Sequence, residues 1–468
     1  MKKHFLYFLL LLYTSSALAQ PAAQVTGFWN GAIQTGGMQL ALVFHIQESN
    51  GALTATMDVP AQSAKGIPVK EVKLVQDSLF LHLPAIGGSY AGKLTAPGTI
   101  EGTWKQSGQT FAMQLKKGEA VQPKRPQEPV KPYPYKEQEV SITNSTAGIK
   151  LAGTFTLPTG KGPFPAVILI SGSGAQDRDG TVMDHKPYLV LADHLTRQGL
   201  AVLRLDDRGV GGSTGNPASA TTLDFATDIT AAYTFLKAQP SINQKKIGLV
   251  GHSEGALIAA KVANQQPDVA YVVLLAGNAV PGTELLVAQN EALLTAAGMP
   301  ETLLKPYLEL RKKQFEVAAT QTDAFAAAKK IRKLEQETTA NLTAEQKTQL
   351  GFTAQSEQAI VAQLSSPWVK HFLAYDPVLT LQKLKQPVLV LNGTNDLQVP
   401  ASQNLPAAEK ALKAAGNKTY TIKEMPALNH LFQTAKTGLP NEYSQLEETF
   451  APLALQTISD WIKSTLKK

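Results

Sequence analysis

Residues 251–255, Gly-His-Ser-Glu-Gly, have the spacing of a serine nucleophile held on a tight turn. The apolar run at 246–250 predicts a strand before this turn, and the run at 256–262 predicts a helix after it. In this setting the turn projects the serine hydroxyl clear of the sheet, and the glycines avoid the clashes that a Cβ would cause. The pattern therefore predicts Ser253 as a nucleophile for acyl transfer.

A serine hydroxyl is a poor nucleophile unless a neighbouring base takes its proton. His430 follows the last predicted strand, 420–423, at the position where such a sheet presents a base. His252 adjoins Ser253, but its side chain is expected to point away from the hydroxyl, and His194 lies on a predicted helix. We therefore predict His430 as the general base.

The base in turn needs an acid that fixes its tautomer and stabilises its charged form. Asp396 is the only carboxylate in the loop 392–400, which follows the predicted strand 387–391. An Asx-type turn is the alternative role for an aspartate in such a loop. Because of its place in the chain order, we predict that Asp396 accepts the Nδ1–H of His430.

A tetrahedral oxyanion needs preorganised donors, and two backbone N–H groups are candidates. One belongs to Glu254, the residue after the nucleophile. The other should come from the glycine-rich loop 171–179, which follows the predicted strand 166–170. We predict the N–H of Ser173 for this role, with that of Gly174 as the alternative.

The run 204–213, Arg-Leu-Asp-Asp-Arg-Gly-Val-Gly-Gly-Ser, contains a G-x-G pattern that invites a nucleotide-binding interpretation. No helix-opening G-x-G-x-x-G with a distal acid completes the pattern. We predict instead a structural loop that supports the oxyanion loop through Asp/Arg pairs, with Asp206 and Arg208 as the supporting residues. The Glu254 side chain is expected to act as scaffold, with substrate contact as the alternative.

The first 19 residues have the features of a secretory signal peptide. Lys2 and Lys3 precede an apolar run at 5–13, and Ala-Leu-Ala at 17–19 predicts cleavage before Gln20. The apolar run is too short for a comfortable membrane span, which needs about 20 residues, although an uncleaved anchor is the alternative. We expect an exported protein, periplasmic or extracellular, without a stable span after processing.

The amino-acid composition excludes several kinds of catalytic site and binding partner. The 468 residues include no cysteine, which excludes disulfides, thiol catalysis and thiolate metal sites, while 43% hydrophobic residues suffice for a large core. The formal net charge is +7 and shows no dense basic cluster, so nucleic acid is not expected as a partner. No metal and no cofactor are predicted.

The chain divides into two predicted domains after the signal. Residues 20–120 hold short alternating runs, such as 40–46 and 78–83, broken by turn residues, which predicts an all-β sandwich or a small, loosely lipocalin-like barrel. Trp29 and Trp104 are expected to plug this barrel. Residues 121–138 are rich in proline and are expected to form an extended linker.

Residues 139–468 predict an α/β domain, because apolar strands alternate with helices and a parallel sheet buried on both faces requires such strands. A helix is expected at 446–465. The stretch 283–372 holds no good strand and predicts two or more helices as a cap over the site, with a solvated decoration as the alternative. The expected strands are 139–143 and 149–157 as an antiparallel pair, then 166–170, 201–205, 246–250, 271–275, 387–391 and 420–423.

These runs together resemble the α/β-hydrolase superfamily and, more narrowly, the bacterial EstD-type serine carboxylesterases. The oxyanion-loop signature H-G-S-G-x-x-D-R-D is matched at 171–179 except at Ser171, which replaces the histidine. The signature D-x-R-G-x-G-x-S is matched at 206–213. The resemblance covers residues 20–468, and it implies the same triad, Ser253, Asp396 and His430.

The leading hypothesis is an exported serine carboxylesterase that cleaves short to medium acyl esters of small molecules through an acyl-enzyme. A serine peptidase of the prolyl oligopeptidase-like type is one alternative, although the β domain is too small for the propeller of those enzymes. Carbohydrate deacetylation and a non-catalytic ligand-binding role are the others. The sequence does not predict the oligomeric state.

Overall fold

The computed structural model describes residues 24–35, 38–49, 51–60, 64–106, 108–118, 124–352 and 354–467. They form two compact units, of which the first lies within 24–118 and the second within 124–467. The predicted signal peptide, residues 1–19, lies outside the described residues.

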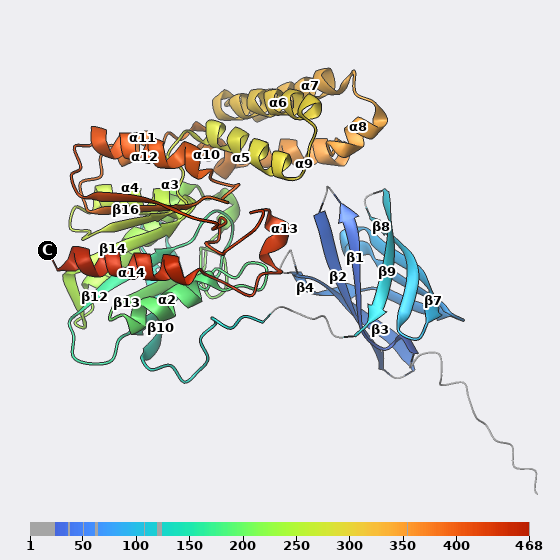
Figure 1. Cartoon of the computed structure of the whole chain (residues 1–468), viewed down its shortest axis with the longest axis horizontal. Helices are drawn as coiled ribbons and strands as arrows, with labels where there is room; N and C mark the ends of the chain where they lie inside the picture. The colour runs from blue at the N-terminus through green and yellow to red at the C-terminus, as the bar shows by residue number, and fades with distance from the viewer. Residues whose placement is uncertain are drawn as a thin grey trace, which may run out of the picture. The chain divides into compact units, whose positions relative to one another are not determined.

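The first unit is one antiparallel sheet in the strand order β4-β3-β2-β1-β9-β8-β7-β6-β5. Strand β5 also lies against β3, and β4 against β6, so the sheet curls into the barrel-like form seen in Figure 1. The all-β prediction for this region is confirmed. The strands are β1 (Gly27–Thr35), β2 (Met38–Ser49), β3 (Ala52–Val59), β4 (Ala64–Val69), β5 (Glu71–Val75), β6 (Ser78–Leu83), β7 (Gly88–Ala96), β8 (Thr99–Gln106) and β9 (Gln109–Lys117).

Alternation of apolar and polar residues builds the core of this unit. Along β6, Leu79 and Leu81 are buried while Phe80 is exposed, as the period of two of a pleated strand requires. Trp29 and Trp104 are fully buried in the same core. Their indole N–H groups are satisfied, by the Val25 carbonyl at 2.6 Å and by Gln106 Oε1 at 3.2 Å.

The second unit is built on an eight-stranded sheet in the order β10-β11-β13-β12-β14-β15-β16-β17. Strands β10 and β11 pair antiparallel with each other, β11 also pairs antiparallel with β13, and the other pairs are parallel. The α/β-hydrolase prediction is thereby confirmed as a fold. The strands are β10 (Lys136–Asn144), β11 (Ile149–Leu157), β12 (Phe164–Ile170), β13 (Ala201–Leu205), β14 (Ile242–His252), β15 (Val272–Leu275), β16 (Val388–Gly393) and β17 (Tyr420–Met425).

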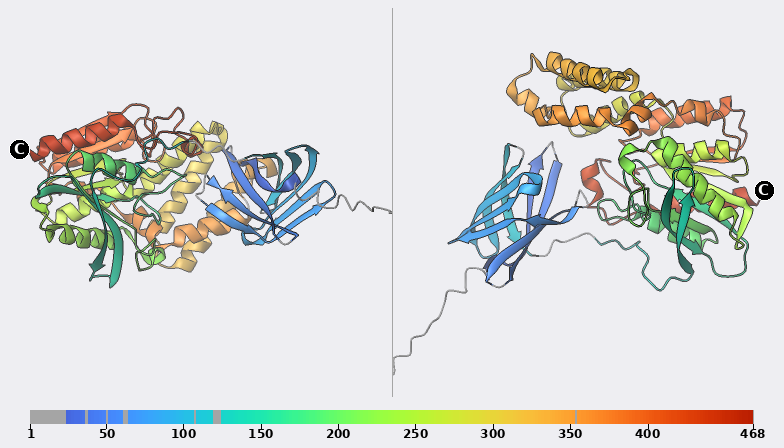
Figure 2. Two further views of the ribbon diagram at one scale, coloured as in Figure 1. Left: turned by 90° about the horizontal axis from the view of Figure 1, so that it is seen from below. Right: turned by 180° about the vertical axis from the view of Figure 1, so that it is seen from behind.

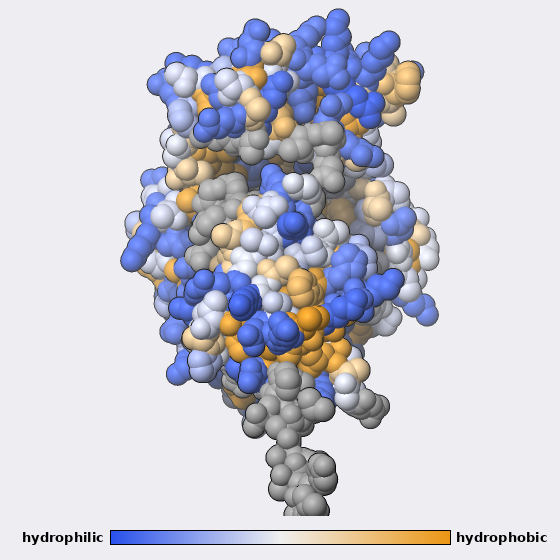
Figure 3. Space-filling model, turned by 90° about the vertical axis from the view of Figure 1, so that its right-hand side faces the viewer, coloured by the Kyte–Doolittle hydropathy of each residue, from blue (hydrophilic) through white to orange (hydrophobic). Residues whose placement is uncertain are grey.

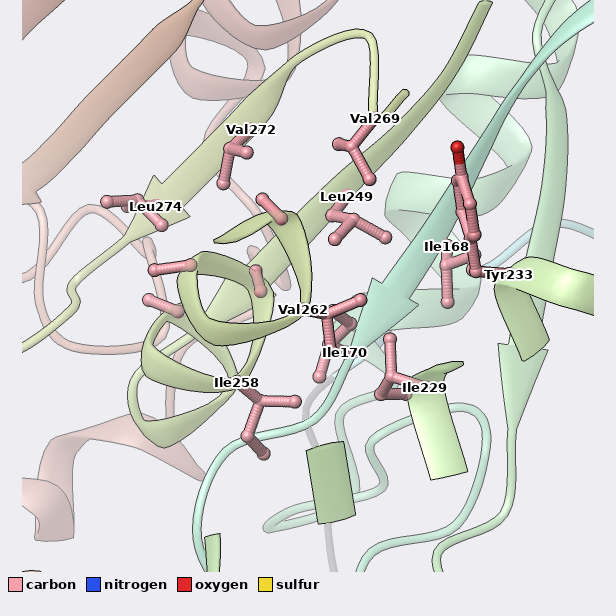
Figure 4. Packing of buried hydrophobic residues seen from close by; sticks show 14 of the residues in the cluster. Ile168, Ile170, Ile229, Tyr233, Leu249, Ile258, Val262, Val269, Val272 and Leu274 are labelled. Atoms are coloured by element: carbon pink, nitrogen blue, oxygen red, sulfur yellow. The ribbon is translucent and has the colours of Figure 1, made fainter. Parts of the chain in front are cut away.

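Helices cover both faces of this sheet (Figure 2). In β12 the side chains alternate, so that Ile168 and Ile170 face one helical layer and Val167 faces the other. Figure 4 shows Ile168 and Ile170 packed near Ile229 and Val262. The first layer comprises α3 (Thr222–Lys237), α4 (Glu254–Gln265), α11 (Val378–Leu381) and α12 (Ala401–Ala414), and the second comprises α2 (Pro187–Arg197) and α14 (Pro452–Leu466).

Helices between β15 and β16 form the cap. They are α5 (Gly282–Ala296), α6 (Glu301–Thr320), α7 (Ala324–Thr339), α8 (Ala344–Gln349), α9 (Ala354–Ser365) and α10 (Pro367–Ala374). Phe315, Ala327 and Ile331 belong to a small core of their own within it. The outer end of the cap, at the top of Figure 3, is largely hydrophilic. Over the described part of the chain, no helix has the length and apolar character needed to cross a bilayer.

The final helix differs from its prediction at the N-terminal end. It begins at Pro452 instead of residue 446, with proline in the first helical turn. The backbone N–H groups of Thr449 and Phe450 donate to Gln127 Oε1, at 2.6 and 3.0 Å. Because these two N–H groups bond the Gln127 side chain and not a carbonyl of the preceding turn, the helix begins later than the apolar periodicity predicts.

The described part of the predicted linker, 124–135, belongs to the second unit and is hydrogen-bonded to it. Arg125 Nη1 donates to the carbonyl of Leu446 at 2.6 Å, and Nη2 donates to that of Ser444 at 2.9 Å. Arg125 Nε donates to the carbonyl of Asp184 at 3.2 Å. One side chain therefore ties together two loops that lie far apart in the sequence.

Candidate active site

Three predicted site residues lie just after parallel strands of the same sheet. Ser253 follows β14, Asp396 follows β16, and His430 follows β17. The carboxyl ends of parallel strands meet at one edge of a sheet, which is where open α/β sheets bind ligands. The fold therefore gathers residues that are separated by up to 177 positions in the chain.

Ser253 occupies a strained turn. Its φ of 55° and ψ of −121° belong to a region that residues with a side chain rarely adopt. A Cβ on Gly251 would lie 2.0 Å from the carbonyl oxygen of Gly255, and one on Gly255 would lie 2.3 Å from that of Ile170. The two glycines are thus required by close backbone packing, and this packing holds Ser253 at its unusual φ.

Asp396 orients His430. Its Oδ2 accepts a hydrogen bond from His430 Nδ1 at 2.8 Å. Its Oδ1 accepts from the backbone N–H groups of Gln398 and Val399, both at 2.9 Å. The Asx-type turn and the orienting role, which the sequence presents as alternatives, therefore coexist in one carboxylate. Asp396 is 3% exposed, so the pairing is held in a dry environment.

Ser253 and His430 line the same cavity, which has a volume of about 730 Å³. Between these two described residues, the structure records no hydrogen bond from Ser253 Oγ to the imidazole. Hydrogen bonds of catalytic groups are commonly long or poorly aligned until substrate is bound. The structure therefore brings nucleophile and base to one cavity, with the Asp396–His430 hydrogen bond already formed.

His252 holds the loop of the predicted base. Its Nε2 donates to the backbone carbonyl of His430 at 2.7 Å, which leaves Nδ1 as the unprotonated nitrogen of a neutral ring. Burial, reinforced by repulsion from His430, lowers the pKa of His252 to about 3. A ring that stays neutral and donates to a carbonyl is poorly suited to act as the base for Ser253.

The predicted oxyanion donors open on the same cavity. Ser173 and Glu254 both line it. Among the described residues, the structure records no acceptor for the backbone N–H of either one, whereas the neighbouring N–H of Gly172 donates to Tyr188 Oη at 3.3 Å. Unpaired N–H groups beside a nucleophile are what an oxyanion requires.

The first residue of the oxyanion loop is anchored by an aspartate that sequence reasoning missed. Ser171 Oγ donates to Asp207 Oδ1 at 2.6 Å, and the backbone N–H of Gln176 donates to Asp207 Oδ2 at 3.0 Å. Burial raises the pKa of Asp207 to about 7, and these two hydrogen bonds oppose the rise. The serine that replaces histidine in the signature thus retains an anchor for the loop.

Asp206 and Arg208 have different partners. Asp206 accepts from Arg178 of the oxyanion loop, through Nε at 3.0 Å and Nη2 at 2.8 Å. Arg208 does not take part in this support, because its Nε donates to Asp228 Oδ2 at 2.8 Å and it stacks on Phe225 of α3. The Asp/Arg pair that supports the oxyanion loop is therefore Asp206–Arg178, while Arg208 fastens the preceding loop to α3.

The Glu254 side chain connects the nucleophile turn to the cap. Its Oε1 accepts from Thr222 Oγ1 at 2.6 Å and from the indole Nε1 of Trp368 at 2.8 Å. Burial is the largest influence on this carboxyl group and raises its pKa. The scaffold role expected from the sequence thus extends to α10, a contact that no local pattern signals.

Two further histidines of the unit bond groups of the framework. His194, on α2, bonds Ser459 Oγ of α14 at 3.0 Å. His185 is fully buried and contacts Thr449 Oγ1 at 2.8 Å and the carbonyl of Tyr443 at 2.9 Å. Among the described residues, no group of three or more His, Asp or Glu side chains is arranged to hold a metal ion.

Comparisons with known proteins agree with this fold. The family model "Serine aminopeptidase, S33" matches residues 179–434, more than half of the chain. Esterase EstD of Thermotoga maritima is 29% identical over 177 residues, 37% of this chain and 41% of that protein. Two uncharacterized proteins of Mycobacterium tuberculosis are 31% identical over 132 residues, 28% of this chain and 43% of each of theirs.

The chain thus spans less than half of the length of these relatives. A solved structure of Pyrococcus furiosus esterase Pf2001 is 15% identical, with 70% of this chain and 93% of that chain covered and a TM-score of 0.41. By the match to its family model, the chain belongs to the S33 serine aminopeptidase family of α/β-hydrolases.

Proposed function

We propose that this protein is an exported serine carboxylesterase that uses Ser253 as nucleophile, His430 as general base and Asp396 as orienting acid. The observation that carries the proposal is the hydrogen bond between Asp396 and His430, formed at 2.8 Å beside the cavity that Ser253 also lines. The partial similarity to Thermotoga maritima Esterase EstD supports ester substrates.

The chemistry follows from this arrangement. His430 takes the proton of Ser253 Oγ as the oxygen attacks the ester carbonyl, and the imidazolium that forms is stabilised by Asp396. The backbone N–H groups of Glu254 and Ser173 receive the negative charge on the carbonyl oxygen. The alcohol leaves with a proton from His430, and a water activated by the same imidazole then releases the acid.

The cavity suits acyl groups of short to medium length. Leu285, Leu286 and Phe315 from the cap line it together with Ser253. Apolar walls around one polar end are typical of a site for a small apolar ligand with one reacting group. We therefore expect an acyl chain to lie under the cap while its carbonyl carbon lies at Ser253.

Hydrolysis of p-nitrophenyl esters from acetate to decanoate by the mature chain tests this function, with Ser253→Ala as the matched control. Activity that peaks at short to medium chains and is lost in the variant supports a carboxylesterase. Full activity in Ser253→Ala would exclude Ser253 as the nucleophile. Export is tested separately, by cell fractionation and by N-terminal sequencing, which should begin at Gln20.

Aminopeptidase activity is the second candidate, because the family model carries that description. A free α-ammonium group requires an acidic partner. Among the described residues that line the cavity, Glu254 is the only carboxylate, and its Oε1 is already bonded to Thr222 and Trp368. We therefore rank esters first. Faster turnover of aminoacyl p-nitroanilides than of esters would reverse this order.

A non-catalytic ligand-binding protein and a carbohydrate deacetylase are further candidates. Covalent labelling of Ser253 by a fluorophosphonate separates the first from an active enzyme, because the reagent requires an activated serine. Release of acetate from acetylated sugars, at a rate above that for p-nitrophenyl acetate, would favour the second.

A further inference from the structure

One face of the cap helix α6 turns toward the cavity. Tyr307, Arg311 and Phe315 follow one another at intervals of four residues, which places them on one side of the helix. All three line the cavity that contains Ser253. A charged residue therefore lies between two ring-bearing side chains of α6 in the wall of the cavity that Ser253 also lines.

Arg311 is held by stacking and not by an ion pair. Its guanidinium lies 4.8 Å from the ring centroid of Tyr307 and 5.9 Å from that of Phe352. Its Nη1 donates to Gln314 Oε1 at 2.8 Å. Among the described residues, no carboxylate lies within ion-pair distance of Arg311. Its position is thus fixed while charge-bearing N–H groups stay available.

The charge balance of the cavity is unusual for an apolar site. Among the described lining residues, Arg311 is the only lysine or arginine. Gln314, which accepts a hydrogen bond from Arg311, also donates through its Nε2 to Glu335 Oε2 at 3.4 Å. Burial raises the pKa of Glu335, and the positive charge of Arg311 opposes that rise. Gln314 thus bonds both Arg311 and Glu335, and of the two charged residues only Arg311 is among those that line the cavity.

Apolar side chains form part of the cavity wall. Leu286, Ile360 and Leu364 line the cavity together with Arg311 and Ser253. An apolar segment of substrate would be buried against these side chains. A guanidinium that is partly removed from water forms its most favourable interaction with a partner of opposite charge. The planar fork of a guanidinium matches the two oxygens of a carboxylate.

We propose that the cavity selects esters whose apolar chain ends in a carboxylate, and that Arg311 is the residue that determines this specificity. The proposal rests on the esterase function proposed above. The ester carbonyl lies at Ser253, and the terminal carboxylate accepts hydrogen bonds from Arg311.

Kinetics with paired substrates test the proposal. The p-nitrophenyl monoesters of dicarboxylic acids from adipate to sebacate are compared with neutral p-nitrophenyl esters of the same acyl length. We expect the full chain to prefer the charged ester at one length within the series. Arg311→Gln should lower the ratio of kcat/KM, charged over neutral, by about 10- to 100-fold, the range for a hydrogen bond to a charged group.

Two variants serve as controls. Lys312→Gln removes the same charge from the next residue of α6, which is exposed, and should leave the ratio unchanged. Arg311→Lys keeps the charge without the planar fork and should retain part of the preference. An unchanged ratio in Arg311→Gln overturns the proposal, and so does an equal fall in Lys312→Gln, which would indicate a long-range charge effect.

A binding measurement separates this inference from the esterase function. Calorimetric titration of full-length Ser253→Ala with monoethyl suberate should give binding that is lost in the double variant with Arg311→Gln. If esters are not hydrolysed but this binding is found, the esterase function fails, and of the inference only the recognition of a terminal carboxylate by Arg311 stands. If neutral esters are hydrolysed without an effect of Arg311, only the inference fails. Tighter binding of a monoalkyl phosphate of matched length would overturn the choice of carboxylate.

Discussion

Trp368, in the cap, donates its indole N–H to Oε1 of Glu254, the residue after the nucleophile, at 2.8 Å. The same oxygen accepts from Thr222 at the start of α3. A single buried carboxylate therefore connects the cap, the nucleophile turn and one helix of the sheet. The position of α10 therefore depends on a side chain of the nucleophile turn.

We expect Trp368→Phe to lower the free energy of unfolding of the second unit by about 1–3 kcal/mol, the cost of leaving a buried polar group without one partner. The stacking on Phe372, at a centroid distance of 5.1 Å, should persist because the new ring is also aromatic. Denaturant unfolding followed by loss of activity measures this cost. The same loss in a Glu254→Met background, whose side chain offers no oxygen acceptor, would show that this hydrogen bond does not carry it.

Asp396→Asn should reduce kcat/KM by about 10³- to 10⁴-fold with little effect on folding. The asparagine oxygen can still accept from the N–H groups of Gln398 and Val399, so the turn is preserved. Its amide nitrogen would face His430 Nδ1 and force the wrong tautomer. Steady-state kinetics together with thermal unfolding separate the two effects, and a variant with unchanged kcat/KM and unchanged stability would show instead that Asp396 acts only as a turn residue.

Asp207 should make stability depend on pH. Because burial raises its pKa from about 4 to about 7, the folded protein binds this proton more tightly than the unfolded chain does. The stabilising contribution is complete below about pH 4 and is lost as pH rises to about 7. Asp207→Asn does not titrate, so its stability relative to the natural chain should improve as the pH rises from about 4 to about 7.

Ser171→Ala is the matched control for that pH dependence. It removes a hydrogen bond that lowers the pKa of Asp207, so the loss of stability should extend to higher pH. Urea unfolding at several pH values measures all three proteins. Parallel curves for the natural chain and Asp207→Asn would contradict the assignment.

Arg125→Ala should lower the free energy of unfolding of the second unit by about 2–3 kcal/mol, because charge-assisted hydrogen bonds to several carbonyls are lost together. Heat inactivation of ester hydrolysis reports on this unit. Lys124→Ala removes the neighbouring exposed charge and should change little. Equal effects of the two substitutions would mean that the segment contributes by charge alone.

The positions of the strands along the chain could be predicted because apolar runs bounded by turn residues are local signals. The bounds of β11 and β13 agree with the prediction to the residue. Strand β14 begins four residues before its predicted start. Its Ile242 pairs with Phe164 across the sheet, and the charged residues that follow hide this pairing from a local pattern.

Contacts between distant segments could not be predicted. Arg125 bonds a carbonyl 321 positions away, and Trp368 meets Glu254 across 114 positions. The role of Asp207 was missed because Asp206 beside it matches the family signature. The roles of Ser253, Asp396 and His430 stay predictions until kinetics test them, although the structure brings all three to one region.

The glycines on either side of Ser253 place a limit on what the five-residue run can reveal about activity. Gly251 and Gly255 are fixed by backbone atoms that would overlap any side chain, whatever the serine does. A descendant that abandoned catalysis could lose His430 or Asp396 and still need both glycines in order to fold. Surveys that select enzymes by this run alone would therefore collect inactive proteins, and the presence of the distant acid–base pair is the better criterion.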